Sequence, residues 1–116
     1  MKITNLDRIE KIPVDMEGAK DVLKQVPISR EDGAPTFSFR VFTIQPNGNT
    51  PCHTHPYEHV NYIIEGQGAV VTGDGEEIEI ERGDFVLIRP DETHQYRNKS
   101  ATDPFVMICA VPKEHE

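Results

Sequence analysis

Short apolar runs alternate with turn residues along almost the whole chain. No segment places apolar residues at helical spacing over three turns, and Gly, Pro, Asn and Asp interrupt the apolar runs throughout. A high density of turns with no helix between the runs favours a sandwich or barrel over parallel βαβ units. We therefore predict an all-β fold with strands at residues 37–44, 60–64, 69–72, 76–81, 85–88 and 105–111.

The order of residues within these runs predicts which side chains face the core. A two-residue period across 77–81 directs Ile78 and Ile80 inward and the glutamates toward water. Four consecutive apolar residues at 85–88 predict a fully buried strand. Residues 73–75, Gly-Asp-Gly, predict a hairpin turn because glycine accepts a positive φ at low cost.

The chain divides into three parts. We expect residues 1–35 to form an N-terminal arm that packs on the barrel or is swapped with it, with an edge strand at 21–26 and a loop at 30–35. Residues 36–112 form the barrel, and 113–116 form a polar tail. A chain of 116 residues is one domain and can bury a core without disulfides or a structural metal.

Charge and cysteine content narrow the range of partners. The net charge is −8, and the basic residues are scattered, so we expect no binding to nucleic acid or to an anionic membrane. No signal-peptide pattern follows Met1, and the apolar stretch 105–111 has about a third of the roughly 20 residues of a membrane helix. Cys52 and Cys109 are far apart and fit a reducing compartment. We therefore expect the cytoplasm as the location.

Four histidines have a pattern suited to a metal ion. His53 and His55 project from the same side of one strand, since successive side chains alternate between faces. Pro56 then bends the chain, so that His59 opens the next strand close to this pair, and His94 follows a later turn. Imidazole is the commonest neutral ligand of transition metals. The His-x-His pair alone indicates little, but four histidines together predict a transition-metal site.

The surrounding residues resemble the first motif of the cupin superfamily, Gly, five residues, His-x-His, three or four residues, Glu, six residues, Gly. Residues 47–66 follow this spacing, with Asn47 in place of the first glycine. Asparagine also enters the left-handed backbone region, so this exchange is tolerable. The position of the glutamate ligand holds His59, while Glu58 next to it is the alternative ligand. We prefer His59, which also shares strand parity with His55.

The second cupin motif is matched at Gly83, His94 and Asn98, but Arg89 stands at its proline position and Asp91 at its glycine position. The resemblance extends to small stand-alone cupins with four-histidine sites, several from thermophiles and some containing manganese. It implies a jelly-roll β-barrel that binds one divalent metal per chain, Mn²⁺ first and otherwise Fe²⁺, Co²⁺, Ni²⁺, Cu²⁺ or Zn²⁺. The metal ligands that it implies are His53, His55, His59 and His94.

The resemblance also implies a function and an assembly. It favours a metalloenzyme, an oxygenase or a lyase/decarboxylase, acting on a small organic acid or phenolic substrate. The alternative is a non-catalytic protein that uses its metal to bind or sense a small ligand, because the fold alone does not choose among these chemistries. We expect a homodimer, in which residues 22–26 contribute to covering the open strand edges.

Three further residues are candidates for catalysis. The resemblance implies that Cys109 faces the metal cavity, although a buried cysteine also packs as a small hydrophobe. Tyr96 and Asn61 share parity with the histidines, so they line the pocket or fill the core. Arg40 lies in an apolar strand, where it either binds a substrate carboxylate or forms an ion pair at the barrel edge. His115 lies in the tail and receives no role.

Overall fold

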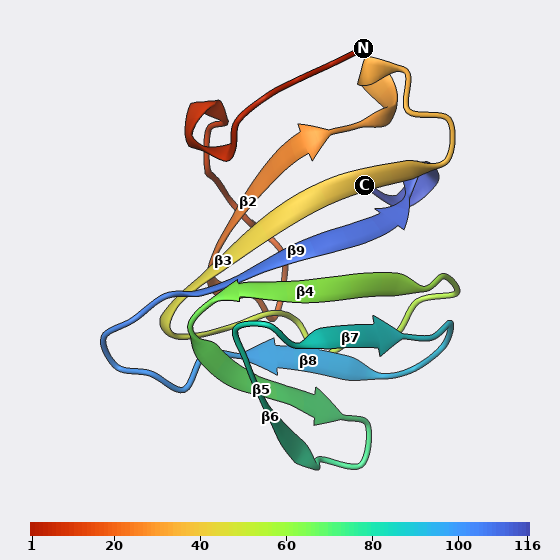
Figure 1. Cartoon of the computed structure of the whole chain (residues 1–116). Coiled ribbons are helices and arrows are strands. Elements are labelled where there is room, and N and C mark those ends of the chain that lie inside the picture. Colours follow the sequence, from red (N-terminus) through yellow and green to blue (C-terminus); the bar gives the residue numbers. More distant parts are fainter.

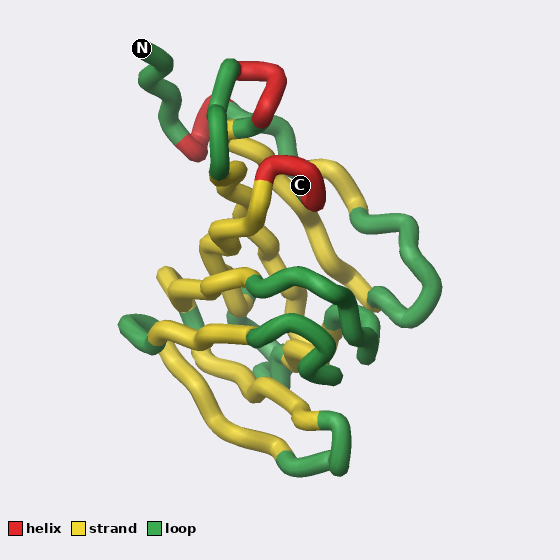
Figure 2. The backbone as a smooth tube through the Cα atoms, turned by 90° about the vertical axis from the view of Figure 1, so that its right-hand side faces the viewer, coloured by secondary structure: helices red, strands yellow, loops and turns green.

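The computed structural model describes all residues, 1–116. Its strands form a single antiparallel sheet that curls on itself (Figure 1). The prediction of an all-β fold is confirmed. Three short 3₁₀ helices, η1 (Leu6–Arg8), η2 (Arg30–Asp32) and η3 (Lys113–His115), lie at one end of the molecule with both termini (Figure 2). The strands are β1 (Ile12–Pro13), β2 (Lys20–Ile28), β3 (Phe37–Asn49), β4 (His59–Glu65), β5 (Gln67–Thr72), β6 (Glu77–Glu81), β7 (Phe85–Ile88), β8 (His94–Arg97) and β9 (Phe105–Pro112).

The long strand β3 connects the part of the sheet that contains β6, β5 and β8 with the part that contains β9, β4 and β7. Residues 37–44 of β3 pair with β9, whereas Asn49 at its end pairs with β8. The resulting strand order is β6-β5-β8-β3-β9-β4-β7, with β2 paired to β3 and β1 paired to β2. The sheet therefore encloses an inner face to which strands distant in sequence contribute neighbouring side chains.

The hydrophobic core lies on this inner face. Every strand except β1 contributes to it, and Ile44, Ile63 and Phe105 are completely buried. Burial of these side chains stabilises the barrel without a metal ion, at about 1.5–3 kcal/mol for each large apolar side chain. The members of the core are Val22, Ile44, Ile63, Val70, Ile80, Ile88, Tyr96, Phe105 and Met107.

Two backbone positions explain how this chain departs from the cupin motifs. Asn47 and Asp91 stand where the motifs have glycine, and both adopt a positive φ, 63° and 65° respectively. Their short polar side chains tolerate this left-handed region, as predicted for Asn47. Gly66 is more restricted, because its φ is 82° and a Cβ there would lie 2.2 Å from the carbonyl oxygen of Pro104.

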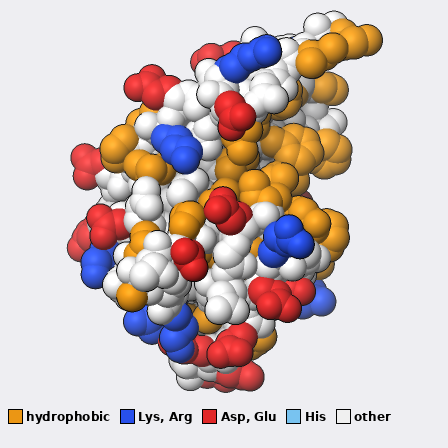
Figure 3. Space-filling model, turned by 60° about the vertical axis from the view of Figure 1, so that its left-hand side comes forward, with side chains coloured by type: hydrophobic (Ala, Val, Ile, Leu, Met, Phe, Trp, Pro, Cys, Tyr) orange, Lys and Arg blue, Asp and Glu red, His pale blue; other side chains and the backbone are white.

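The prediction that residues 85–88 are fully buried is wrong. This segment is β7, an edge strand paired only with β4, and Phe85 and Leu87 are 74% and 51% exposed on its outer side. Ile80 faces inward as predicted, but Ile78 is 45% exposed where β6 forms the opposite edge. On the face shown in Figure 3, hydrophobic side chains gather along one margin, and charged side chains are scattered over the rest.

The N-terminal segment pairs with the edge of β2 that does not pair with β3. The predicted edge strand at 21–26 is present as part of β2, and β1 pairs with its residues Leu23 and Lys24. The Gln25 side chain donates hydrogen bonds to the carbonyl oxygens of Leu6 and Ile9, at 2.9 and 2.8 Å. Backbone and side-chain hydrogen bonds therefore hold the arm.

The C-terminal segment is also ordered rather than a loose tail. Residues Lys113–His115 form η3, and the Glu116 carboxylate accepts hydrogen bonds from the Ser38 hydroxyl and the Arg30 backbone N–H. The predicted loop at 30–35 begins with η2. None of the helices has the length and apolar character needed to cross a lipid bilayer.

Candidate metal centre

The backbone brings the two histidine segments together. His53 and His94 form an isolated antiparallel bridge, in which each backbone N–H donates to the other's carbonyl, at 3.1 and 3.0 Å. The carbonyl oxygen of His55 accepts the backbone N–H of Asp91 at 2.8 Å. His59 is the first residue of β4, and its side chain is buried on the inner face, as is that of His94 at the start of β8.

All four histidines that the sequence singled out lie in one cluster. One ring nitrogen from each of His53, His55 and His94 lies within 4.8 Å of the other two. His59 joins the cluster through His94, with the two Nε2 atoms 3.2 Å apart, and its ring centroid lies 5.0 Å from that of His55. The sequence spacing of these residues therefore translates into spatial convergence.

Hydrogen bonds fix the tautomer of three of these rings. The Nδ1 atoms of His55 and His94 lie 2.8 Å from the backbone carbonyl oxygens of Tyr57 and Glu92, respectively. The Nδ1 of His59 lies 2.7 Å from the amide oxygen of Asn61. Oxygen acceptors require the proton to be on Nδ1, so each Nε2 presents a free lone pair. Three imidazoles therefore point unprotonated nitrogens into the cluster.

Burial favours the neutral form of three of the four rings. The pKa of His59 falls to about 3, first because the ring is buried and second because His94 is nearby. Burial also lowers the pKa of His53 and of His94. The lone pairs on Nε2 of His59 and His94 consequently face each other across 3.2 Å, with no proton favoured between them. Such an arrangement is repulsive by itself and fits a cation shared by the two nitrogens.

Strand parity separates the histidines from Glu58. Along residues 52–59, the side chains of Cys52, Thr54 and Glu58 are exposed, while those of the histidines are partly or fully buried. Glu58 therefore lies on the opposite side of the chain from the cluster, and His59 lies within it.

A cavity of about 180 Å³ opens beside the histidines. Its apolar wall comes from Val22, Phe42 and Met107, on adjacent strands β2, β3 and β9. The other residues lining it are Val14, Met16, Lys24, Arg40, Thr50, Pro51, His53, His55, Tyr57, His59, Asn61, His94, Tyr96 and Cys109. The cavity therefore contains all three of the candidate catalytic residues.

The contacts of these candidates differ. The Tyr96 hydroxyl donates to the Asn61 amide oxygen at 2.8 Å, and burial raises the pKa of Tyr96. Buried Cys109 accepts a hydrogen bond at its Sγ, 3.0 Å from Nη2 of Arg40. Arg40 has no carboxylate within ion-pair distance, since the ion pairs of the chain involve other residues. The ion pair considered for Arg40 is therefore absent.

An aromatic stack that the sequence analysis missed lies beside the cluster. Tyr57 is stacked between His55 and His115, with ring centroids 4.0 and 3.8 Å away and ring planes within 8° and 3°. His115, to which the sequence analysis gave no role, thus connects the C-terminal segment through Tyr57 to His55 of the cluster. Tyr57 shares the two-residue spacing of His53, His55 and His59, which was a sequence signal that it lies on their side of the chain. No sequence signal marks His115.

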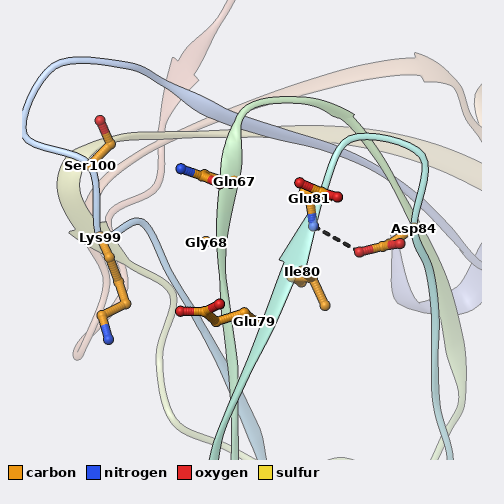
Figure 4. A pocket seen from close by; sticks show the side chains of 8 residues that line it. All are labelled: Gln67, Gly68, Glu79, Ile80, Glu81, Asp84, Lys99 and Ser100. Atoms are coloured by element: carbon orange, nitrogen blue, oxygen red, sulfur yellow. Dashed lines mark hydrogen bonds between the residues drawn. The ribbon is translucent and has the colours of Figure 1, made fainter.

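A larger hollow of about 460 Å³ lies elsewhere, between β5, β6 and the segment after β8 (Figure 4). Its carboxylates do not converge. Asp84 accepts the backbone N–H of Glu81 at 2.8 Å, which stabilises a turn, and Lys99 forms an ion pair with Glu77. Local structure therefore accounts for the charges of Asp84 and Lys99, and the smaller cavity, which contains the histidines, is the candidate site.

The fold and the cluster define a jelly-roll barrel with histidines gathered on its inner face. The family model described as "Cupin domain" matches residues 40–111, and this chain belongs to that family. The match includes the four clustered histidines and all of the strands from β4 to β8.

Relatives of this chain include enzymes. A gentisate 1,2-dioxygenase of Ralstonia sp. is 37% identical over 63 residues, 54% of this chain and 18% of that protein. An uncharacterized protein of Methanocaldococcus jannaschii is 34% identical over 71 residues, 60% of this chain and 56% of that protein. This chain thus spans about half of the Methanocaldococcus protein and less than a fifth of the dioxygenase.

A solved structure matches almost the whole chain. The polyketide cyclase RemF of Streptomyces resistomycificus superposes with a TM-score of 0.92 and 29% identity, covering 97% of this chain and 80% of that one. The match therefore includes the N-terminal arm as well as the barrel.

Proposed function

We propose that this chain is a metal-dependent enzyme that holds one divalent transition metal on His53, His55, His59 and His94. The observation that carries this proposal is the pair of Nε2 lone pairs 3.2 Å apart at His59 and His94. Zinc–imidazole bonds of about 2.0–2.1 Å put neighbouring ligand nitrogens about 3.0 Å apart in octahedral geometry and about 3.4 Å apart in tetrahedral geometry. The separation of 3.2 Å between the two Nε2 atoms lies between these values.

The ligand set also bears on the choice of metal. Four neutral imidazoles leave the full 2+ charge on the ion and suit Zn²⁺, Cu²⁺, Fe²⁺ and Ni²⁺, with Co²⁺ close in affinity. The resemblance to manganese-containing cupins favours Mn²⁺, which we place first. Four protein ligands leave two positions of an octahedral ion for a substrate or a co-substrate.

The cavity volume limits the size of the substrate. A protein cavity of about 150 Å³ accommodates benzene, and most sites for drug-sized ligands exceed about 300 Å³. A cavity of about 180 Å³ therefore fits one substituted ring or a small organic acid, not a fused polycyclic compound. Gentisate is itself a phenolic acid, so the dioxygenase relatives are a better guide to substrate size than the polyketide cyclase.

When bound, the metal supplies Lewis-acid polarisation of an oxygen donor and, if redox-active, a route for electrons to dioxygen. The rest of the chemistry falls to the protein. Val22, Phe42 and Met107 exclude water from one side of the substrate. Asn61 keeps the proton of His59 on Nδ1, and Tyr96 orients Asn61. With its hydroxyl already donated and its pKa raised, Tyr96 acts as a positioning residue rather than as a proton donor.

Metal analysis of tag-free protein tests this ligand set. Replacing any one of the four clustered histidines by alanine should sharply reduce metal occupancy. Glu58→Ala and His115→Ala are the matched controls, since Glu58 is exposed and His115 lies in the aromatic stack outside the cluster. Loss of metal in Glu58→Ala together with retention in His59→Ala would show that the ligand assignment is wrong.

Oxygen consumption and product analysis test catalysis. Protein loaded with Mn²⁺, Fe²⁺ or Cu²⁺ should convert some monocyclic phenol or small organic acid, and His94→Ala should abolish this turnover. The panel should include substrates for decarboxylation as well as for oxidation. Ligand binding without turnover by any metal form would favour the non-catalytic alternative instead.

A further inference from the structure

The histidine cavity has a charge opposite to that of the whole chain. The protein has 20 acidic and 12 basic residues, yet none of the 17 residues lining this cavity is Asp or Glu. Two of them, Lys24 and Arg40, are basic. A divalent metal on the histidines would add to this positive charge. An anion is therefore the complementary occupant.

Arg40 has unused hydrogen-bonding capacity. Its Nη2 donates to Sγ of Cys109 at 3.0 Å and its Nη1 to the carbonyl oxygen of His115 at 3.4 Å. Its Nε is buried and has no hydrogen-bond partner. The guanidinium carbon lies over the ring of Phe42, 5.0 Å from the ring centroid, which helps to hold the group in place. A guanidinium has five N–H groups, and these two hydrogen bonds leave the others able to donate to the oxygens of a carboxylate.

Lys24 adds a second cation from the neighbouring strand. It pairs with Phe42 across β2 and β3, and it lines the same cavity as Arg40. Lys24 is in none of the ion pairs of the chain. The nearby Glu116 carboxylate accepts hydrogen bonds from Ser38 and from the backbone of Arg30. Burial lowers the pKa of Lys24 and the positive charge of Arg40 lowers it as well, while the smaller effects of Glu116 and Cys109 raise it without cancelling this shift. A bound anion would relieve this repulsion.

We propose that Arg40 and Lys24 form a carboxylate subsite facing the histidines. The substrate is then a small monocarboxylic acid whose second oxygen donor reaches the metal. This inference rests on the proposed function for the metal end of the substrate only. It selects the acid among the phenols and acids that the cavity volume admits.

A pair of isosteric ligands tests the subsite. Calorimetric titration compares 2-hydroxybenzoate with neutral 2-hydroxybenzamide, using both zinc-loaded protein and chelator-treated protein. The wild type should bind the carboxylate at least tenfold more tightly than the amide, since charge-assisted hydrogen bonds are about twice as strong as neutral ones. The preference should persist without zinc, although both affinities fall.

Substitutions then assign the preference to residues. Arg40→Gln and Lys24→Met should each remove most of the preference, and Arg40→Lys should retain part of it because it keeps the charge but loses the fork. Lys20→Met, an exposed lysine on the same strand, is the control and should bind like the wild type. Circular dichroism verifies the fold of each variant.

The outcomes separate this inference from the proposed function. Equal affinity for the two compounds, no binding of either, or an equal effect of Lys20→Met and Lys24→Met overturns the subsite. A carboxylate preference that depends on Arg40 and Lys24, in a protein whose histidines bind no metal, supports the subsite while refuting the metalloenzyme. Metal binding without a carboxylate preference would support the metal site and refute the carboxylate subsite.

Discussion

Replacing Asn61 by alanine should destabilise both the protein and its metal site. The Asn61 amide oxygen accepts two buried hydrogen bonds, from Nδ1 of His59 at 2.7 Å and from the Tyr96 hydroxyl at 2.8 Å. Asn61 is 1% exposed, so water does not readily replace it. Asn61→Ala therefore leaves two buried donors without an acceptor, whereas Tyr96→Phe removes one donor and leaves the bond from His59 intact.

The two variants differ in expected magnitude. An unsatisfied buried donor costs about 1–3 kcal/mol, so Asn61→Ala should lower the free energy of unfolding by about 2–6 kcal/mol. Tyr96→Phe should cost about 1 kcal/mol, the net contribution of one hydrogen bond. Residues that orient a metal-bound histidine typically change metal affinity by about 10–100-fold. Asn61→Ala should show this loss, and Tyr96→Phe should show little.

Urea unfolding of chelator-treated protein measures the stability difference, and competition with a chromophoric chelator measures zinc affinity. Domains of this kind have free energies of unfolding of about 5–15 kcal/mol, so Asn61→Ala should still fold unless a cost near 6 kcal/mol meets a stability near 5 kcal/mol. A variant that is already unfolded without urea would itself show a cost far above that of Tyr96→Phe. The reasoning is refuted if Asn61→Ala costs no more than Tyr96→Phe in both measurements. That result would mean that another group accepts the His59 proton.

Three further outcomes are expected. Chelation should leave the barrel folded but lower its melting temperature by roughly 10 °C where metal was present at about a hundred times its Kd; complete unfolding at 25 °C would instead make the metal structural. Because the folded state disfavours protonation of His59, whose pKa falls from 6.5 to about 3, chelated protein should lose stability as pH decreases from about 6.5 toward 3. Urea unfolding across this range should show a smaller pH dependence in His59→Gln. Residues 22–26, which we expected in the dimer interface, already pair with β3 and, at Leu23 and Lys24, with β1. We therefore propose a homodimer that covers the exposed apolar residues Phe85 and Leu87 instead, so Leu87→Lys should shift sedimentation equilibrium toward the 13.1 kDa monomer, and a wild type already monomeric at micromolar concentration would contradict this.

The sequence predicted the fold class and most strands because their apolar runs and turns are local signals. The sequence did not predict the exposure of a side chain where that exposure depends on whether the strand lies at the edge or in the middle of the sheet. Residues 85–88 are as apolar as a central strand, yet β7 is at the edge of the sheet, so Phe85 and Leu87 face outward. The strand β8 was missed because His94–Arg97 is short and polar, although its buried and exposed side chains alternate.

The convergence of the histidines was predictable because strand parity is a two-residue rule that holds locally. The same rule placed Glu58 on the exposed side, in agreement with the structure. Lys24 could not be found in this way. Its position beside the cavity depends on the register of β2 against β3, which pairs Lys24 with Phe42, and on the curl of the sheet. The contact of His115 with Tyr57 likewise requires the end of the chain to fold back onto the barrel.

The charge of the cavity shows why whole-chain charge is a poor guide to the ligand. We expect a net charge of −8 to repel polyanions, which contact a large surface, but its effect on a small acid is limited by screening over about 8 Å at physiological ionic strength. Inside the cavity the charges are partly removed from water, so the screening is weaker and the two cations at Lys24 and Arg40 dominate. An acidic protein surface and a site for a small carboxylate are therefore compatible. We therefore expect the surface charge to govern contact with large partners and the charge of the cavity to govern the choice of a small ligand.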